Sequence, residues 1–257
     1  MNKLQFDSIV KKNGFSIGER EYALLSKFVE LIIEWNAKIN LISRKDVENI
    51  WQRHLLGSLA MLFNFQLKEN ANVVDVGTGG GFPGIPLAIC LPDVSFTLVD
   101  SIQKKVNVVT DIIEKLQLHN AKVLCGRAEE LNMKAVHNRK FDYVTARAVA
   151  PITDVIGWTK MFLRTVPPTS SVILSPRFIG GEESQKRQGV EILHFVQNDK
   201  IGIAPGAIII FKGGDVTPEI QQARIKYKPK SIETLPLVID GIDPAEFSEK
   251  KLVIVRP

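Results

Sequence analysis

Closely spaced glycines in the stretch VVDVGTGGGFPGIPLAI (residues 73–89) suit a turn that binds a nucleoside ligand. Their spacing fits the G-x-G-x-x-G pattern that follows a strand and opens a helix in dinucleotide sites. Asp75 stands just before the glycines, where a carboxylate would repel a pyrophosphate but tolerate the amino acid and sulfonium groups of S-adenosyl-L-methionine. We therefore expect Asp75, Gly77, Gly79 and Gly81 to bind S-adenosyl-L-methionine, with a nicotinamide dinucleotide as the alternative.

Asp100 ends the next apolar run, SFTLVD (residues 95–100). A carboxylate at the end of this strand can accept hydrogen bonds from both hydroxyls of a ribose. Such a residue serves either cofactor, so Asp100 predicts a bound nucleoside without choosing between the two.

The first part of the chain has helical periodicity. Leu24, Phe28, Leu31, Ile32 and Trp35 predict an amphipathic helix over residues 20–35. A second helix is expected from Val47, Ile50, Leu55, Leu59 and Leu62, with Asp46 as its N-cap. We interpret residues 1–68 as a helical extension packed on a second unit.

Residues 69–257 alternate between apolar, β-branched runs and helical segments, and this alternation predicts an α/β fold with a mostly parallel sheet. The expected strands contain NVVDVG, SFTLVD, AKVLC, FDYVTA and AIIIF, with helices after Gly84 and over about residues 103–117. The runs SIETLPLVI and KKLVIVRP are separated by a segment too short for a helical crossover, so they should pair antiparallel. Residues 169–205 are rich in turn-forming and charged residues and predict an inserted loop or hairpin.

Composition is that of an ordinary globular protein, with a formal net charge of +5 and an isoelectric point near 9.1. This charge permits a polyanionic partner without requiring one. No apolar run approaches the length of about 18 residues that a membrane helix needs, and no signal peptide is evident, so we expect a cytoplasmic protein. The cysteines and histidines lack metal-ligand spacing, so we expect no metal, and Cys90 and Cys125 should be reduced, buried thiols.

Several stretches together resemble the bacterial small-subunit (16S) ribosomal RNA N7-guanine methyltransferases, the glucose-inhibited division protein B family. The resemblance is carried, in family order, by EWNAKINLIS (34–43), IWQRHLLGSL (50–59), the glycine-rich stretch above, TLVDSIQKKV (97–106), GRAEEL (126–131) and FDYVTARAVA (141–150). It implies a class I, Rossmann-like, S-adenosylmethionine-dependent methyltransferase preceded by a helical extension. It further implies cofactor contacts at Gly77, Phe82, Ala128, Glu129 and Arg147.

The implied chemistry needs no catalytic acid or base, because N7 of guanine carries an in-plane lone pair. The implied partner is ribosomal RNA or the small ribosomal subunit, bound by a monomer. Candidate RNA-binding cations are Arg44, Lys45, Arg53, Lys212, Arg224, Lys226 and Lys228. Two other functions remain open: a small-molecule methyltransferase, and a non-catalytic ribosome-binding relic in which the insertion at residues 169–205, just before the strand AIIIF, disrupts the cofactor site.

Overall fold

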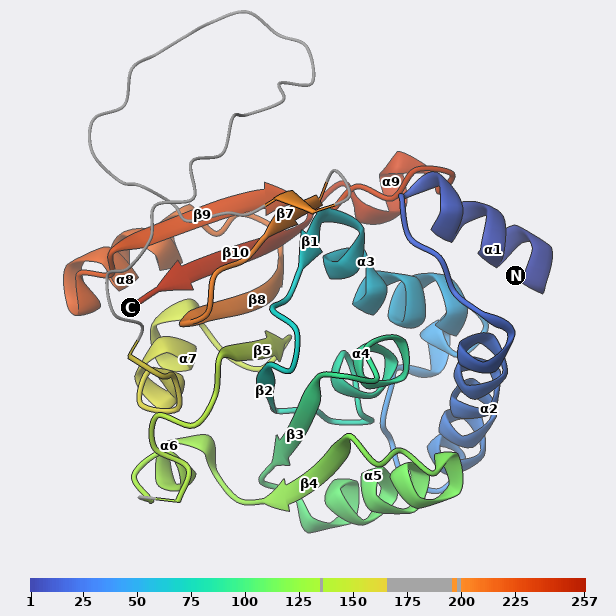
Figure 1. The fold of residues 1–257 in the computed structure, drawn as a ribbon, viewed down its shortest axis with the longest axis horizontal. Helices are drawn as coiled ribbons and strands as arrows, with labels where there is room; N and C mark the ends of the chain where they lie inside the picture. The colour runs from blue at the N-terminus through green and yellow to red at the C-terminus, as the bar shows by residue number, and fades with distance from the viewer. Residues whose placement is uncertain (135, 166–195, 198–199) are drawn as a thin grey trace, which may run out of the picture.

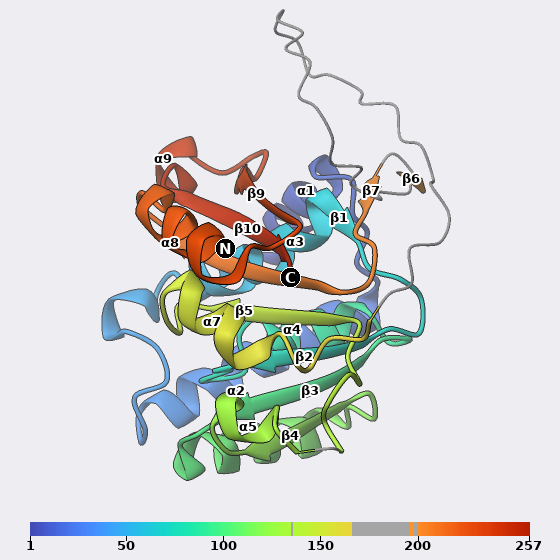
Figure 2. The same cartoon turned by 90° about the vertical axis from the view of Figure 1, so that its left-hand side faces the viewer.

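A seven-stranded sheet forms the centre of the computed structural model, which describes residues 1–134, 136–165, 196–197 and 200–257. Figure 2 shows the strands stacked in the order β4-β3-β2-β5-β8-β10-β9. The parallel strands are β2 (Asn72–Val76), β3 (Ser95–Asp100), β4 (Ala121–Cys125), β5 (Tyr143–Arg147) and β8 (Ala207–Gly213). β10 (Lys250–Arg256) runs antiparallel to both β8 and β9 (Ser231–Pro236). The predicted sheet and its antiparallel C-terminal pair are thus confirmed.

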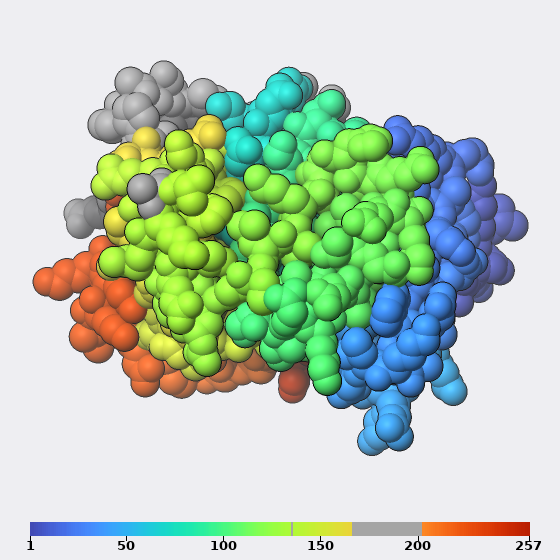
Figure 3. Space-filling model, turned by 90° about the horizontal axis from the view of Figure 1, so that it is seen from below, coloured from blue at the N-terminus to red at the C-terminus, as the bar shows by residue number. Residues whose placement is uncertain are grey.

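Helices cover both faces of the sheet, as a parallel sheet requires. In Figure 1 one face carries α4 and α5, and the other carries α6, α7 and α8. Their bounds are α4 (Gly84–Cys90), α5 (Gln103–Leu116), α6 (Ala128–Leu131), α7 (Ile152–Thr159) and α8 (Thr217–Tyr227). Figure 3 looks along the sheet from its β4 edge and shows α5 and α6 between the N-terminal and C-terminal parts of the chain.

Alternate residues of each strand are buried on opposite faces, which explains why the strand sequences are apolar throughout. In β8, Ile209 and Phe211 belong to the core beneath α4 and α5, whereas Ile208 and Ile210 belong to the core beneath α7 and α8. The sheet therefore separates two hydrophobic cores.

The N-terminal extension contains α1 (Lys3–Lys12), α2 (Glu19–Asn36), a 3-10 turn η1 (Arg44–Asp46), a π-helix η2 (Ile50–Leu56) and α3 (Gly57–Asn64). The helix predicted over residues 20–35 is confirmed as α2. The second predicted helix is confirmed over residues 50–64 as η2 and α3, but its predicted N-cap is wrong, because Asp46 ends η1 and caps no helix. Its carboxylate instead accepts a hydrogen bond from Arg53 at 2.8 Å.

The extension and the sheet share one hydrophobic core. The Phe28 ring on α2 packs against the Phe82 ring in the glycine turn, with centroids 5.0 Å apart. Trp35 Nε1 donates a hydrogen bond to Asp111 on α5 at 2.8 Å. The division at residues 68 and 69 stays a prediction, since the packing is continuous across it.

The segment predicted as an insertion lies largely outside the described residues. Within the described part, β6 (Val196–Gln197) and β7 (Lys200–Gly202) pair antiparallel, and β7 pairs parallel with β1 (Phe65–Gln66). The strand that follows, β8, pairs with β5 on one side and β10 on the other. The insertion therefore leaves this central strand complete.

The structure also bears on the two cysteines, which the sequence predicts to be buried, and on membrane-spanning helices. Cys90 is partly buried, and desolvation raises the pKa of its thiol to about 12. Cys125 is exposed at the end of the edge strand β4, so its predicted burial is wrong. Among the described residues, no helix is long and apolar enough to cross a membrane.

We predict that Phe28→Ala destabilises the protein by about 3–5 kcal/mol, because a fully buried ring is lost and a cavity remains. Urea unfolding followed by circular dichroism measures this change. Ile33→Ala on the same helix is the matched control, because Ile33 is 43% exposed and its truncation should cost about 0.5 kcal/mol or less. Equal losses from the two variants would contradict the role of Phe28 in joining the extension to the sheet.

Candidate active site

The glycine turn after β2 has a backbone that only glycine adopts easily. Gly77, Gly79 and Gly81 have φ angles of +68°, +60° and +92°. A Cβ at Gly77 would lie 2.5 Å from Val149, whereas a Cβ at Gly79 would meet only a carbonyl oxygen 4.0 Å away. The turn is thus packed against the segment after β5 at Gly77 and open at Gly79, where a ligand can approach the backbone.

Asp75 is fully buried at the centre of the sheet. Its Oδ1 accepts a hydrogen bond from Thr145 Oγ1 on β5 at 2.8 Å, and its Oδ2 accepts one from the Gly84 amide at 3.2 Å. Burial raises the pKa of Asp75 to about 6, although the neighbouring Thr78 hydroxyl and these two hydrogen bonds oppose the rise. The carboxylate therefore ties β2 to β5 and to the first residue of α4, and so fixes both ends of the turn.

The remaining predicted cofactor residues lie at the carboxyl ends of neighbouring strands. Asp100, at the end of β3, accepts hydrogen bonds from the amides of Gly79 and Ile102, each at 2.9 Å. Ala128 is buried at the start of α6. Glu129 follows it, and its carboxylate pairs with Arg127 at 3.4 Å. Asp75 through Glu129 thus line one edge of the sheet, over β2, β3 and β4.

Phe82 contacts the extension as well as the turn. Its ring is 6% exposed and lies between Phe28 and His54, whose ring centroid is 5.1 Å away. Burial lowers the pKa of His54 to about 4, and the charge of Arg147 lowers it further while Asp46 opposes the shift. His54 is therefore neutral at pH 7, with its Nε2 atom 3.7 Å from Asp46.

Arg147, at the end of β5, donates hydrogen bonds to the extension. Its Nη1 atom lies 3.1 Å from the His54 carbonyl and 3.0 Å from Ser58 Oγ, and its Nη2 atom lies 2.8 Å from the Arg53 carbonyl. Burial lowers the pKa of Arg147 to about 10, so it stays charged at pH 7. Much of the hydrogen-bonding capacity of this guanidinium is thus used by carbonyls of the π-helix. The sequence resemblance instead implies that Arg147 contacts the cofactor.

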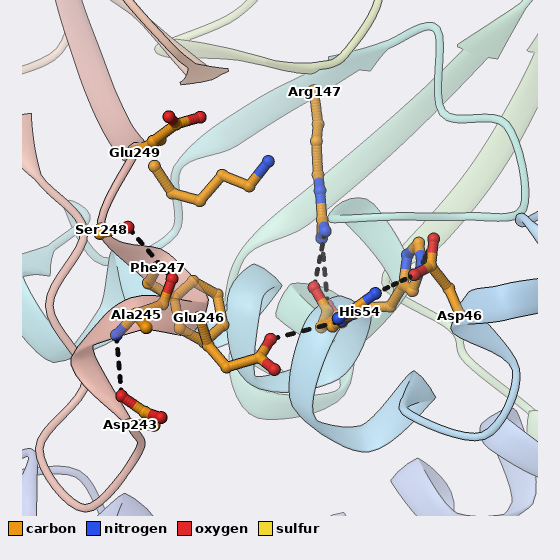
Figure 4. Close-up of a pocket in the computed structure, with 11 residues that line it drawn as sticks. Asp46, His54, Arg147, Asp243, Ala245, Glu246, Phe247, Ser248 and Glu249 are labelled. Carbon is orange, nitrogen blue, oxygen red and sulfur yellow. Dashed lines mark hydrogen bonds and ion pairs between the residues drawn. The ribbon is translucent and has the colours of Figure 1, made fainter.

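A pocket of about 610 Å³ opens beside the turn, between the extension and the C-terminal segment (Figure 4). Figure 4 shows Arg147 and His54 on one side of it and Glu249 on the other. The segment with α9 (Pro244–Phe247) supplies the second wall. The lining residues are Asp46, Arg53, His54, Arg147, Asp243, Ala245, Glu246, Phe247, Ser248, Glu249 and Lys250.

The turn and the pocket flank a topological switch point. The chain passes from β2 to β3 and β4 on one side, and then crosses to β5 and β8 on the other. In open α/β sheets, ligands bind outside the carboxyl ends of the strands at such a point. The predicted cofactor residues lie on the β2-β3-β4 side, and the pocket lies on the β5-β8-β10 side. Two ligands can therefore meet between β2 and β5.

The predicted RNA-binding cations do not form one patch. Arg44 and Lys45 are exposed on η1, next to the pocket residue Asp46. Arg53 is paired with Asp46 at 2.8 Å and Glu246 at 3.3 Å. Lys212, near the carboxyl end of β8, is paired with Glu219 at 2.8 Å. The cluster at Arg224, Lys226 and Lys228 ends α8 and lies at the opposite edge of the sheet from the turn.

Sequence reasoning missed the C-terminal wall of the pocket. Glu246 and Glu249 line the same pocket as Arg53 and His54 only because the fold joins segments far apart in the chain. The one local signal was Asp243-Pro244, a helix N-cap followed by proline at the first helical position. This signal predicts a short helix, but it gives no indication of a pocket.

His54 gives a pH-dependent prediction. Its pKa is about 4 when folded and 6.5 when unfolded, so the unfolded state binds the extra proton in this range. The free energy of unfolding should therefore fall by up to about 3 kcal/mol as the pH drops from 6.5 to 4, relative to His54→Gln. Urea unfolding across this range measures the difference. His119→Gln, at an exposed site, should keep the wild-type pH dependence, and an identical profile for His54→Gln would refute the assignment.

Known proteins resemble this chain in sequence and in fold. Residues 21–168 match the family model for rRNA small subunit methyltransferase G. The protein named ribosomal RNA small subunit methyltransferase G in Bacteroides fragilis is 42% identical over 167 residues, which cover 64% of this chain and 77% of that protein. The protein of the same name in Porphyromonas gingivalis is 32% identical over 243 residues, covering 89% and 93%.

A solved structure from Corynebacterium glutamicum superposes with a TM-score of 0.51 at 10% identity, covering 90% of this chain and 89% of that one. This likeness concerns the fold alone. The family match spans more than half of the chain, and it includes the glycine turn, Asp100, Glu129 and Arg147. The chain therefore belongs to the rRNA small subunit methyltransferase G family.

Proposed function

We propose that this protein transfers the methyl group of S-adenosyl-L-methionine to N7 of a guanine in small-subunit (16S) ribosomal RNA. The observation that carries the proposal is the open glycine turn lying beside a polar pocket at the switch point of the sheet. Family membership supplies the reaction class and the RNA. We further propose that the protein acts in the cytoplasm as a monomer.

The residues around the turn suit this cofactor, which when bound supplies an electrophilic methyl group on a sulfonium. The open face at Gly79 lets a ligand contact the backbone. Each oxygen of Asp100 accepts one amide hydrogen bond and keeps a lone pair for a ribose hydroxyl. Ala128 and Glu129 stand next along the edge, where they would contact the adenine.

Asp75 acts on the cofactor through the turn. Its two oxygens are occupied by Thr145 and Gly84, so it holds the glycines in their ligand-binding conformation. Gly77, Gly81 and Phe82 complete the turn, and the Phe82 ring fixes its position against the extension.

The chain's contribution to the reaction is to align two ligands. Because N7 attacks with its own lone pair, no side chain has to remove a proton. Positioning of this kind can supply about 7–11 kcal/mol in favourable cases. The neutral His54 adds no positive charge beside the sulfonium, and Arg147 holds His54 and the π-helix in place.

RNA would reach the pocket along the exposed cations of η1. Arg44 and Lys45 make no ion pair within the described part of the chain, and they directly precede the pocket residue Asp46. The Arg53 and Lys212 side chains are already paired and would contribute less. Arg224, Lys226 and Lys228 would contact only RNA that extends to the other edge of the sheet.

Three alternatives are separable by experiment. A small-molecule methyltransferase would transfer labelled methyl to metabolites and not to RNA. A ribosome-binding relic would fail to bind S-adenosyl-L-methionine. The position of the predicted insertion just before β8 motivated this alternative, and the complete pairing of β8 with both neighbours weakens it. A dehydrogenase would bind a nicotinamide dinucleotide in competition.

We expect a strain lacking this gene to lose one N7-methylguanosine from its 16S ribosomal RNA. Nucleoside mass spectrometry of small-subunit RNA measures the change, and reintroducing the wild-type gene should restore it. An unchanged level of N7-methylguanosine would contradict the proposed reaction.

We expect Gly79→Ala to abolish S-adenosyl-L-methionine binding in calorimetry, because the new methyl group occupies the open face of the turn. Gly214→Ala is the matched control, since Gly214 has a φ of +70° and no atom lies within 4 Å of the place that a Cβ would take. Both variants carry a similar backbone strain, of about 1–2 kcal/mol. Similar cofactor affinity in the two would mean that the turn is not the binding site.

A further inference from the structure

The pocket has charged groups of both signs, but most of them are already engaged. The Asp46 and Glu246 carboxylates pair with Arg53, and the Asp243 carboxylate accepts the Ala245 amide at 3.0 Å. The Arg147 guanidinium is occupied by the π-helix. Across the residues that the structure describes, Glu249 and Lys250 are the charged side chains of the pocket without a hydrogen bond or ion pair.

The free carboxylate is the more informative of the two. A pocket that only held phosphates would not need an acceptor of this charge. Guanine is the common RNA base that presents two adjacent donors, N1–H and the N2 amino group, on its Watson–Crick edge, and one carboxylate can accept from both. Adenine presents one amino donor beside an acceptor nitrogen, which a carboxylate would repel.

The position of Glu249 suits this contact. Glu249 lies across the pocket from His54 and Arg147 (Figure 4), and their side adjoins Phe82 in the glycine turn. In guanine, N7 lies on the Hoogsteen edge, and O6 separates it from the N1–H and N2–H₂ donors of the Watson–Crick edge. A base bound to Glu249 through its Watson–Crick edge would therefore leave N7 free to face the turn.

The segment that carries Glu249 is held at two points by the extension. Asn13 on the loop after α1 exchanges two hydrogen bonds with the Asp240 backbone, at 2.9 and 3.0 Å. Arg53 donates to Glu246 at 3.3 Å. These contacts fix the α9 segment relative to the π-helix, so Glu249 stands at a defined distance from the turn.

We propose that the pocket receives the target guanosine of the ribosomal RNA and that Glu249 selects guanine by accepting hydrogen bonds from N1–H and N2–H₂, while Lys250 holds a neighbouring phosphate. This inference rests on the proposed function. During transfer, the N7–methyl bond forms and the methyl–sulfur bond breaks, with its electron pair left on sulfur. Positive charge passes to the guanine ring and no proton moves, so the carboxylate binds the transition state more strongly than the neutral base.

The test uses the full-length protein and small subunits from a strain lacking this gene. Wild-type protein first establishes which guanine acquires an N7-methyl group, and no methylation at this step would overturn the proposed function itself. Subunits with adenine at the mapped position then serve as the second substrate. Glu249→Gln keeps the shape of the side chain but turns it into a donor and acceptor that matches the adenine edge.

Glu249→Gln should lower the single-turnover rate on guanine about 10- to 100-fold and raise the ratio of adenine to guanine methylation. Glu249→Asp should retain the wild-type preference, and S-adenosyl-L-methionine affinity should be unchanged in both variants. Glu69→Gln removes the same charge from an exposed site just before β2, at the amino ends of the strands, and should behave as wild type. A wild-type rate and preference in Glu249→Gln would overturn the role of Glu249 while leaving the proposed function intact.

Discussion

The bond between the Arg147 guanidinium and the π-helix is the contact on which the site depends. The Arg53 and His54 carbonyls of the π-helix lie where a planar, forked donor can reach both. Arg147 stands at the end of β5, so this bond fixes the extension to the sheet at the edge where ligands bind. A lysine at this position could not donate in two directions from one plane.

The other features of the site follow from this junction. With the π-helix held in place, the His54 ring packs on Phe82 and burial keeps it neutral. The Phe82 ring in turn positions the glycine turn, whose two ends are tied by Asp75. The same helix presents Arg53 to Glu246, which positions the C-terminal wall of the pocket. The extension is thus a structural part of the active site, although most of its residues contact no ligand.

Much of the fold could be predicted from the sequence, because its signals are local. Strands buried on both faces are apolar throughout, and the glycines and Asp75 mark the turn directly. The start expected for the second helix, at Asp46, was wrong because that carboxylate pairs with Arg53, a competition that spacing does not reveal. The helix α8 could not be predicted because only Ala223 on it is buried, so its apolar residues show little helical periodicity. Glu249 could not be found, since its neighbours in the pocket come from the other end of the chain.

The described residues on either side of the segment 166–195 contact the sheet far from the ligand-binding site. On the near side, Leu163 bridges to Phe141 just before β5, and on the far side Gly206 donates to the Asp142 carbonyl at 2.7 Å. Both attachment points lie at the amino ends of the strands, roughly 15 Å of strand away from the turn and the pocket. Changes of length between these points therefore leave the spacing of the ligand-binding residues untouched. Evolution can lengthen or shorten this connection without having to rebuild the site.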